Sequence, residues 1–233
     1  MKFTVEGVEH ELPSSQEKEY GDAFRAACDA MGRALEIIRS PGFSDRSKWK
    51  VDCSNEHITV HYKDIDGLRY FAAKTIIAVP ASVLFKSHWN DLDKVNEYND
   101  NVKFSRCLHK LTDNIDVANY ASNEKFMVKS REFVVARMHV KVGNGIVLAA
   151  RSCDIDGFTP AKDAVRGFVH VGAGWYYPNP EDPENSSIYD YIMCMDLKGM
   201  IIKTVANQAL GKLVLSDVEN NRTFAHKLAM QYS

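Results

Sequence analysis

The sequence predicts an α+β fold in which an antiparallel sheet is followed by one long C-terminal helix. Six segments between residues 104 and 195 have the short apolar pattern of strands, and no helical pattern separates them. Successive strands without intervening helices pair antiparallel. Residues 201–231 carry an apolar stripe with the period of an amphipathic helix. No repeat or linker divides the chain, so we expect a single domain over residues 1–233 with its core at about 17–231.

The first expected element is a helix. Ser14-Ser15-Gln16-Glu17 has the form of a capping box, with Ser14 as the N-cap and Glu17 reaching back to it. Pro41-Gly42 ends the helix. The apolar positions between these signals recur at three and four residues: Phe24, Ala27, Cys28, Met31, Leu35 and Ile38.

Strands follow on both sides of a short helical region. The first three are expected at residues 49–53, 58–63 and 69–77, with Asp66-Gly67 as a hairpin turn. Pro80 then begins a helical region that extends to residue 98. The six later strands are expected at residues 104–111, 115–121, 133–142, 146–155, 165–177 and 188–195.

The last helix is long enough to cross a whole sheet. If residues 201–231 are helical throughout, the helix is about 45 Å long. Nine strands and one such helix could pack solid, but a strongly curved sheet leaves room beneath the helix, where ligand cavities form. The sequence therefore predicts a helix that closes either a core or a cavity.

Composition excludes several classes of protein. The 233 residues are 45% hydrophobic and 26% charged, with a net charge of −2, and no basic stripe predicts nucleic-acid binding. Five scattered cysteines without C-x-x-C spacing indicate neither a zinc site nor a disulfide framework, so we expect free thiols in a reducing compartment. The N-terminus does not have the pattern of a signal peptide. We predict a cytoplasmic monomer.

Three segments carry a family resemblance. Ser130-Arg131-Glu132-Phe133, Val165-Arg166-Gly167 and Asp196-Leu197-Lys198-Gly199 resemble the signature segments of START domains, the lipid-transfer domains related to steroidogenic acute regulatory protein. Tyr98-Asn99 resembles the family's Trp-Asn, with Tyr in place of Trp. The resemblance runs from about residue 20 to 228 in the right order, and the segments are most similar to the sterol-binding branch.

The resemblance implies a helix-grip fold with an internal lipid cavity. In that fold nine antiparallel strands curve around the C-terminal helix, which acts as a lid. The loop at residues 123–130 is the Ω-loop that opens opposite the lid. Phe126, Met127 and Val128 form a predicted gating loop whose apolar side chains either dip into a membrane surface or pack into the domain itself. The lid also has roughly six residues more than its relatives after Gln208-Ala209-Leu210.

Arg137 is the first candidate for a polar contact inside the cavity. It stands in an apolar run, and a buried guanidinium requires a partner. The resemblance implies that this arginine faces the cavity and pairs with an acid on the preceding strand, but Ala118 or Tyr120 occupies the acid's position. Asp116 shares their face of the strand, because side chains alternate with period two, so we expect it to be the substitute partner. Alternatively, Arg137 ties two strands together or reaches solvent.

The other predicted lipid-binding residues come from the same strands, the last strand and the lid. With Arg137 they form the set Asp116, Tyr120, Phe133, Val135, His139, Tyr191, Met193, Val205, Ala209 and Leu213. Either face of the last strand could meet the lipid. Trp175, Tyr176 and Tyr177 could cage a choline head group.

No catalytic motif is present in the sequence. The eight histidines show no H-E-x-x-H pattern, and there is neither a G-x-S-x-G elbow nor a phosphate-binding loop. We therefore predict a lipid-binding or lipid-transfer protein, not an enzyme, without a cofactor, holding one lipid and touching membranes transiently. Sterol is the first expectation. The alternatives are a phospholipid or sphingolipid carrier, a lipid-sensing interaction module and, since helix-grip relatives include cyclases and hydrolases, an enzyme.

Overall fold

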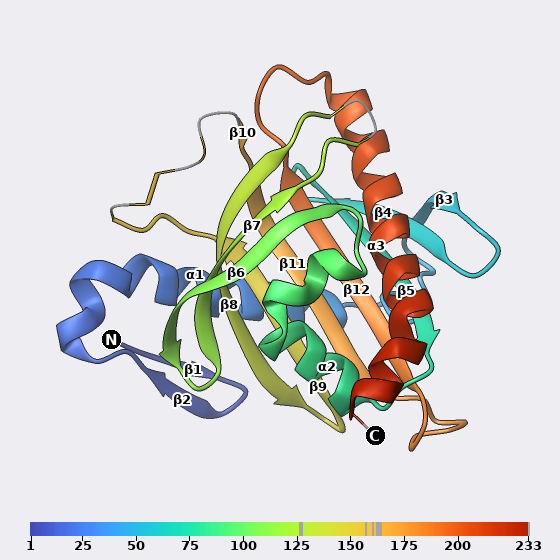
Figure 1. Cartoon of the computed structure of the whole chain (residues 1–233), viewed down its shortest axis with the longest axis horizontal. Helices are drawn as coiled ribbons and strands as arrows, with labels where there is room; N and C mark the ends of the chain where they lie inside the picture. The colour runs from blue at the N-terminus through green and yellow to red at the C-terminus, as the bar shows by residue number, and fades with distance from the viewer. Residues whose placement is uncertain (126–127, 157, 160, 162–164, 233) are drawn as a thin grey trace.

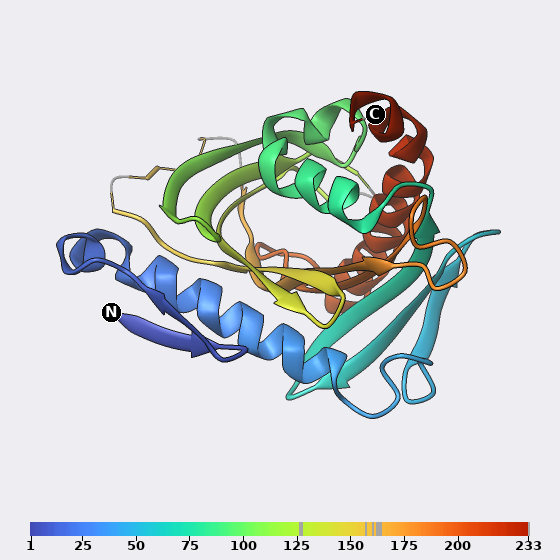
Figure 2. The ribbon, with the colours of Figure 1, turned by 90° about the horizontal axis from the view of Figure 1, so that it is seen from below.

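The computed structural model describes residues 1–125, 128–156, 158–159, 161 and 165–232. They form a strongly curved sheet with one long helix against its convex face and another across its concave face (Figure 1, Figure 2). In chain order the helical segments are the 3-10 turn η1 (Ser14–Gln16), α1 (Glu17–Ile38), α2 (Ala81–Asn90), the 3-10 helix η2 (Leu92–Glu97) and α3 (Lys203–Tyr232). The strands are β1 (Lys2–Val5), β2 (Val8–Glu11), β3 (Lys50–Ser54), β4 (Thr59–Ile65), β5 (Leu68–Ile77), β6 (Val102–Thr112), β7 (Ile115–Ser122), β8 (Arg131–Val142), β9 (Gly145–Ser152), β10 (Val165–Arg166), β11 (Phe168–Pro178) and β12 (Ser187–Asp196).

The large sheet confirms the predicted fold class. In the described part of the chain, nine strands pair antiparallel in the order β3-β4-β5-β12-β11-β9-β8-β7-β6. A tenth strand, the two-residue β10, pairs parallel with the start of β8. Asp66 and Gly67 form the expected turn between β4 and β5, both with positive φ.

Two local predictions are wrong, and one hairpin was not predicted. The strand expected at 165–177 is two strands, because the chain leaves β8 at Gly167, where an added Cβ would overlap the Phe133 ring. Ser14 is not a helix N-cap: it begins a 3-10 turn without a side-chain cap bond, and α1 begins at Glu17. The hairpin β1–β2 was not expected, since its strands have only four residues each.

The two faces of the sheet bury separate cores. The apolar stripe of α1 packs on the convex face, against residues of β8, β9 and β11 and against Ile192 and Cys194 of β12. On the concave face, α3 packs against β3, β4, β5 and β12. Because side chains alternate along β12, Tyr189, Tyr191 and Met193 point to this concave face.

The C-terminal helix α3 lies along the concave face (Figure 1). With 30 residues α3 is about 45 Å long, as expected, although it begins at Lys203. Within the described segments no helix has both the length and the apolar character needed to cross a bilayer. The five cysteines are free thiols.

Candidate functional site

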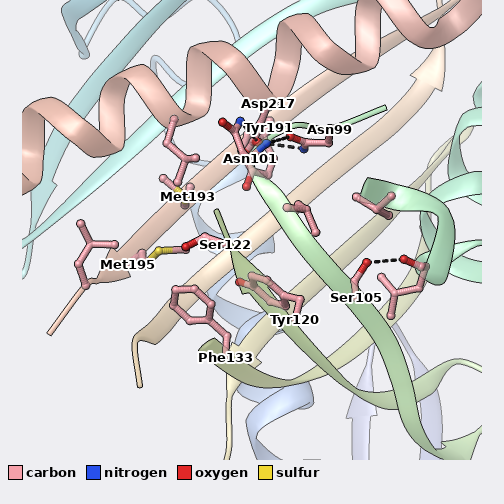
Figure 3. Close-up of a pocket in the computed structure, with 15 residues that line it drawn as sticks. Asn99, Asn101, Ser105, Tyr120, Ser122, Phe133, Tyr191, Met193, Met195 and Asp217 are labelled. Atoms are coloured by element: carbon pink, nitrogen blue, oxygen red, sulfur yellow. Dashed lines mark hydrogen bonds between the residues drawn. The ribbon is translucent and has the colours of Figure 1, made fainter. Parts of the chain in front are cut away.

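A cavity lies between the concave face of the sheet and α3. Its first lobe has a volume of about 230 Å³ and is shown in Figure 3. Apolar side chains of η2, β6, β8, β12 and α3 form most of its wall: Leu92, Val95, Val102, Phe133, Met193, Met195, Leu197 and Leu213. Thioether side chains adapt to ligands of irregular shape, so Met193 and Met195 suit an apolar guest.

A second lobe of about 210 Å³ continues the cavity toward α2. Its wall is more polar and includes His88, Arg137, Tyr176 and Asn221. The residues that line both lobes are Leu92, Val95, Asn99, Tyr120, Tyr191 and Asp217. Taken together the two lobes reach the lower part of the range typical of ligand pockets, which is about 300–1,000 Å³.

Asp217 of α3 is the acidic residue at the junction of the lobes. Its Oδ1 accepts hydrogen bonds from the side-chain amides of Asn99 at 3.0 Å and Asn101 at 2.7 Å (Figure 3). The orientation of the Asn99 amide is fixed, because its oxygen accepts from the Asn101 backbone N–H and from Asn220. Among the described residues, no hydrogen bond to Oδ2 is found. Asp217 is half-buried and lines both lobes of the cavity.

The environment of Asp217 changes its acidity. Burial raises the pKa of its carboxyl to about 6, against the effect of the two amide donors, which lower it. Burial also raises the pKa of Tyr120 and of Tyr191, and the negative charge of Asp217 adds to both shifts. Both phenols are therefore neutral hydroxyls at physiological pH. No hydrogen bond to either hydroxyl occurs within the described ranges of the chain.

The predicted pair of Arg137 and Asp116 is present. Arg137 Nε lies 2.8 Å from Asp116 Oδ1 and Nη2 lies 2.6 Å from Oδ2, and the two residues are 6% and 1% exposed. Such a two-point contact between fully buried groups neutralises both charges. Arg137 lines the second lobe, whereas Asp116 lies behind it.

Arg137 also holds the end of α2. Its Nη1 donates to the carbonyl of His88 at 3.0 Å and its Nη2 to the carbonyl of Trp89 at 3.2 Å, while its guanidinium lies over the Trp89 ring. These carbonyls are at the C-terminal end of the helix, where they lack helical partners and a positive charge is favourable. Of the five guanidinium N–H groups, one on Nη1 is left for a ligand.

His88 joins α2, α3 and the sheet. Burial lowers its pKa to about 4, so the ring is neutral at physiological pH. Its Nε2 donates to Asn221 Oδ1 at 2.6 Å, and its Nδ1 accepts from the Tyr176 hydroxyl at 2.7 Å. This assignment follows because Asn221 uses its amide nitrogen for the backbone carbonyl of Asp217. One ring nitrogen therefore joins α2 to α3 and the other joins α2 to β11.

The structure divides the predicted lipid-binding residues into two groups. Those that line the cavity are Tyr120, Phe133, Arg137, Tyr191, Met193 and Leu213. Those outside both lobes are Asp116, Val135, His139, Val205 and Ala209.

The second group lies outside for reasons of packing. Val135 packs with Ala118 and Val169 in a small cluster of buried apolar side chains from neighbouring strands. His139 lies beyond the cavity at the end of β8, against the rings of Phe85 and Trp89. Ala209, in the second turn of α3, is buried in the apolar core between the helix and the sheet, and Val205 is half-buried in the first turn.

Of the predicted gating loop, Phe126 and Met127 lie outside the described residues. Val128 is 8% exposed and packs in the core of the concave face, and its backbone pairs with that of Lys125 through two hydrogen bonds. Among the described residues, Met200 and Ile202, between β12 and α3, are exposed apolar side chains. The aromatic cage does not form: Trp175 packs with the α1 core, whereas Tyr176 lies on the other face beside His88.

Asp217 and Asn221 were not predicted, although the sequence contains a signal for them. They lie four and eight residues after Leu213, on the apolar stripe of α3. Polar residues on the buried face of a helix require polar partners. Those partners, Asn99 and His88, lie more than 100 residues earlier in the chain.

Comparison with known proteins gives a consistent result. Residues 34–230 match the START domain family. Steroidogenic acute regulatory-like protein 1 of Caenorhabditis elegans is 31% identical over 222 residues, which cover 94% of this chain and 85% of the relative. Steroidogenic acute regulatory protein, mitochondrial, of Homo sapiens is 23% identical over 209 residues, which cover 88% of this chain and 70% of the relative.

Solved structures share the fold. Human StAR-related lipid transfer protein 5 has a TM-score of 0.78 at 15% sequence identity, over 90% of this chain and 99% of that chain. Human STARD10 has a TM-score of 0.71 at 20% identity, over 86% of this chain and 79% of that chain. At these identities the similarity is one of architecture.

Proposed function

Because this chain belongs to the START domain family, we propose that it binds one lipid in the cavity beneath α3 and carries it between membranes. The observation that carries this proposal is the position of the cavity. Its apolar first lobe lies between the concave face of the sheet and the lid helix, in contact with Met193 and Leu213. Burial of a lipid's apolar surface there contributes about 25 cal/mol per Å².

Sterol is the proposed lipid. The printed names of the two relatives, both steroidogenic acute regulatory proteins, support this choice. Arg137 contributes to the site in two ways: it holds α2 over the second lobe, and its remaining N–H is available to a ligand oxygen directly or through water. A phospholipid or sphingolipid is the alternative cargo.

Release of the lipid requires that α3 or a neighbouring loop moves. Besides the apolar contacts of α3 with the sheet, hydrogen bonds join Asp217, Asn220 and Asn221 to the segments around Asn99 and His88. Arg131 connects the loop before β8 to the segment before α3, since it donates to the carbonyls of Lys129, Leu197 and Lys198. We therefore propose that the lipid enters and leaves between the loop before β8 and the segment before α3.

The same end is the proposed membrane contact. Met200 is fully exposed and Ile202 is 72% exposed, and Lys198 and Lys203 flank them. Apolar tips with basic neighbours bind lipid surfaces. We expect Met200→Ser to slow extraction of lipid from vesicles without weakening the bound state. Val8→Ser, at an exposed apolar residue of the β1–β2 hairpin, is the matched control.

Carriage is proposed in preference to catalysis. Among the described residues, no group of three or more His, Cys, Asp or Glu could hold a metal ion. The buried histidine that lines the cavity, His88, is neutral and uses both ring nitrogens to hold neighbouring elements. The proposed carrier acts in the cytoplasm as a monomer without a cofactor. Fractionation of cells tests the cytoplasmic location, and sedimentation of the purified chain tests whether it is a monomer.

A vesicle-to-vesicle transfer assay tests the function. Donor vesicles hold a fluorescent sterol and acceptor vesicles hold a quencher, and the rate of quenching is measured with and without the protein. Leu213→Trp fills the first lobe and should abolish the added rate. Met230→Trp, an exposed position of the same helix, should leave it unchanged. Binding without transfer would identify a lipid sensor, and equal rates for both variants would place the lipid elsewhere.

A further inference from the structure

We propose that Asp217 selects uncharged lipids that carry a hydroxyl group, because its free carboxylate oxygen accepts the hydrogen bond of that hydroxyl. This inference rests on the proposed function and narrows it. It concerns the chemistry of the head group and not the apolar body, which the first lobe accommodates.

The position of Asp217 suits this role. The residue lines both lobes, so it lies between the apolar part of the cavity and the more polar part. A lipid with its apolar body against Met193 and Phe133 would bring its head group to the junction of the lobes. The carboxylate would therefore lie where the apolar body of the lipid joins its polar head group.

The hydrogen bonds of Asp217 determine which group it can bind. Its Oδ1 already accepts from Asn99 and Asn101, whose amides are held in orientation by Asn220 and Ser216. Its Oδ2 has no hydrogen-bond partner among the described residues, and the residue lines both lobes of the cavity. A carboxylate oxygen only accepts, so its missing partner is a donor. A hydroxyl supplies one, whereas a ketone or an ester does not.

The charges around the cavity disfavour a phosphate head group. Arg137 is the one Lys or Arg side chain among the residues that line the lobes, and Asp116 neutralises it. Lys125, which lies near Asp217, pairs with Asp100 at 2.6 Å. An anionic phosphate would therefore meet a carboxylate and no unpaired cation on the described walls, and like charges at such a site repel.

Tyr120 and Tyr191 complete the polar junction. Both hydroxyls lack hydrogen-bond partners in the described part of the chain, and both residues line the two lobes. They remain protonated because burial and the nearby carboxylate disfavour phenolate. Each phenol can therefore donate to the oxygen of the same ligand hydroxyl whose hydrogen Asp217 accepts.

A matched pair of ligands tests the proposal. The purified full chain is incubated with vesicles that hold equal amounts of 5α-cholestanol and 5α-cholestan-3-one, which differ at one oxygen. Native mass spectrometry then gives the ratio of the two bound forms. We expect the hydroxyl form to exceed the ketone about 10- to 100-fold, the size of one hydrogen bond to a charged group. Parallel incubations use ceramide, ceramide with its hydroxyls methylated, and phosphatidylcholine.

Two variants assign the effect to Asp217. Asp217→Asn keeps an acceptor for Asn99 and Asn101 but presents an N–H to the cavity, so the ratio should fall toward 1. Asp100→Asn makes the same change of charge on the adjacent loop, outside both lobes, and should keep the ratio of the unmodified chain. Thermal melting of each variant shows whether it is folded, and the ratio in the unmodified chain tests the proposal without any variant.

Each outcome has a distinct meaning. Preference for ceramide over its methylated form would support the same hydroxyl contact with a sphingolipid as its source. A ratio near 1 in the unmodified chain, an unchanged ratio in folded Asp217→Asn, or preferred binding of phosphatidylcholine would overturn the inference and leave lipid carriage standing. Absence of any lipid adduct would overturn both.

Discussion

At the residue scale, the buried ion pair of Asp116 and Arg137 stabilises the fold, in addition to the contact of Arg137 with the cavity. Arg137→Met leaves the Asp116 carboxylate buried without its partner and leaves the last carbonyls of α2 unsatisfied. Removal of one member of a buried pair costs about 3–5 kcal/mol. We expect a loss of this size in the free energy of unfolding, measured with urea.

The double variant Arg137→Met, Asp116→Leu is the control for this prediction. It removes the orphaned charge together with the arginine, so part of the lost stability should return. If Arg137 acted only as a contact for lipid, the single variant would keep the stability of the unmodified chain and would change lipid binding alone.

The raised pKa of Asp217 predicts that its contribution to the stability of the fold decreases as the pH rises. Burial raises the pKa of its carboxyl from 3.8 to about 6, so the folded state binds the proton more tightly than the unfolded state. The charged group therefore destabilises the fold above about pH 6, and this penalty disappears as the pH falls toward 4. We expect Asp217→Asn to be more stable than the unmodified chain at pH 7.5 by on the order of 2 kcal/mol, and not at pH 4.

The difference in stability between the unmodified chain and Asp217→Asn separates the effect of Asp217 from that of other titrating groups. His88, whose pKa is lowered to about 4, has the opposite effect, since its stabilisation is complete above the unfolded pKa and is lost as the pH falls toward 4. His88 is present in both proteins, so its contribution cancels in the difference. Denaturation curves at several pH values supply the measurement, and a difference that does not change between pH 4 and 7.5 would contradict the prediction.

The sequence reveals some of these residues and not others. Arg137 could be found because a charge interrupts an apolar strand, and Asp116 because strand alternation restricts the faces. Asp217 also interrupts an apolar stripe, but its role depends on Asn99 and Asn101, and only the folded chain brings these three residues together. The hydrogen bonds of Arg137 to the carbonyls of α2 are equally a property of tertiary structure.

At the element scale, the absence of a side chain at Gly167 leaves room for the ring that forms part of the wall of the first lobe. A Cβ there would overlap the ring of Phe133, which lines that lobe. Gly167→Ala should push the ring into the cavity and cost about 1–3 kcal/mol, as overpacking does. Thermal melting and lipid occupancy should both decrease.

Gly172→Ala is the matched control in the adjoining strand. Its added Cβ would lie 3.6 Å from Val169, an ordinary contact. Similar losses in the two variants would show that the effect comes from backbone freedom and not from the ring of Phe133.

The role of α3 as a lid can be tested with a reversible cross-link. Asn220 of α3 donates to Asp100 at 3.2 Å, so their side chains are close enough to consider the variant Asp100→Cys, Asn220→Cys. When oxidised, it should hold α3 shut and slow lipid exchange, and a reductant should restore the rate. Each single cysteine variant is a control for the five native thiols. Exchange at an unchanged rate in the cross-linked protein would show that the lipid leaves by another route.

Elements were predictable where local pattern and tertiary packing agree. The nine strands of the main sheet and the long α3 follow from periodicity and turn residues. The short hairpin β1–β2 and the break at Gly167 do not, because four-residue strands carry little pattern and the break reflects the position of the Phe133 ring. The side of β12 that faces the cavity is settled only by where α1 packs.

At the scale of the whole molecule, the two cores have different tasks. The core between α1 and the convex face is closed by apolar contacts such as those of Phe24 and Met31. The concave face is covered by α2 and α3 (Figure 2). Their apolar contacts are accompanied by the polar contacts of His88 and Asp217. One face supplies stability, and the other encloses the space for a ligand.

The central claim is that one lipid occupies this space. Native mass spectrometry of the purified chain after incubation with mixed vesicles, with extraction and identification of the bound lipid, tests it most directly. We predict one lipid per chain, retained in Met230→Trp and lost in folded Leu213→Trp, whose added ring fills the first lobe. A chain that emerges from the vesicles without lipid, or a Leu213→Trp variant that binds as much as the unmodified chain, would contradict the account.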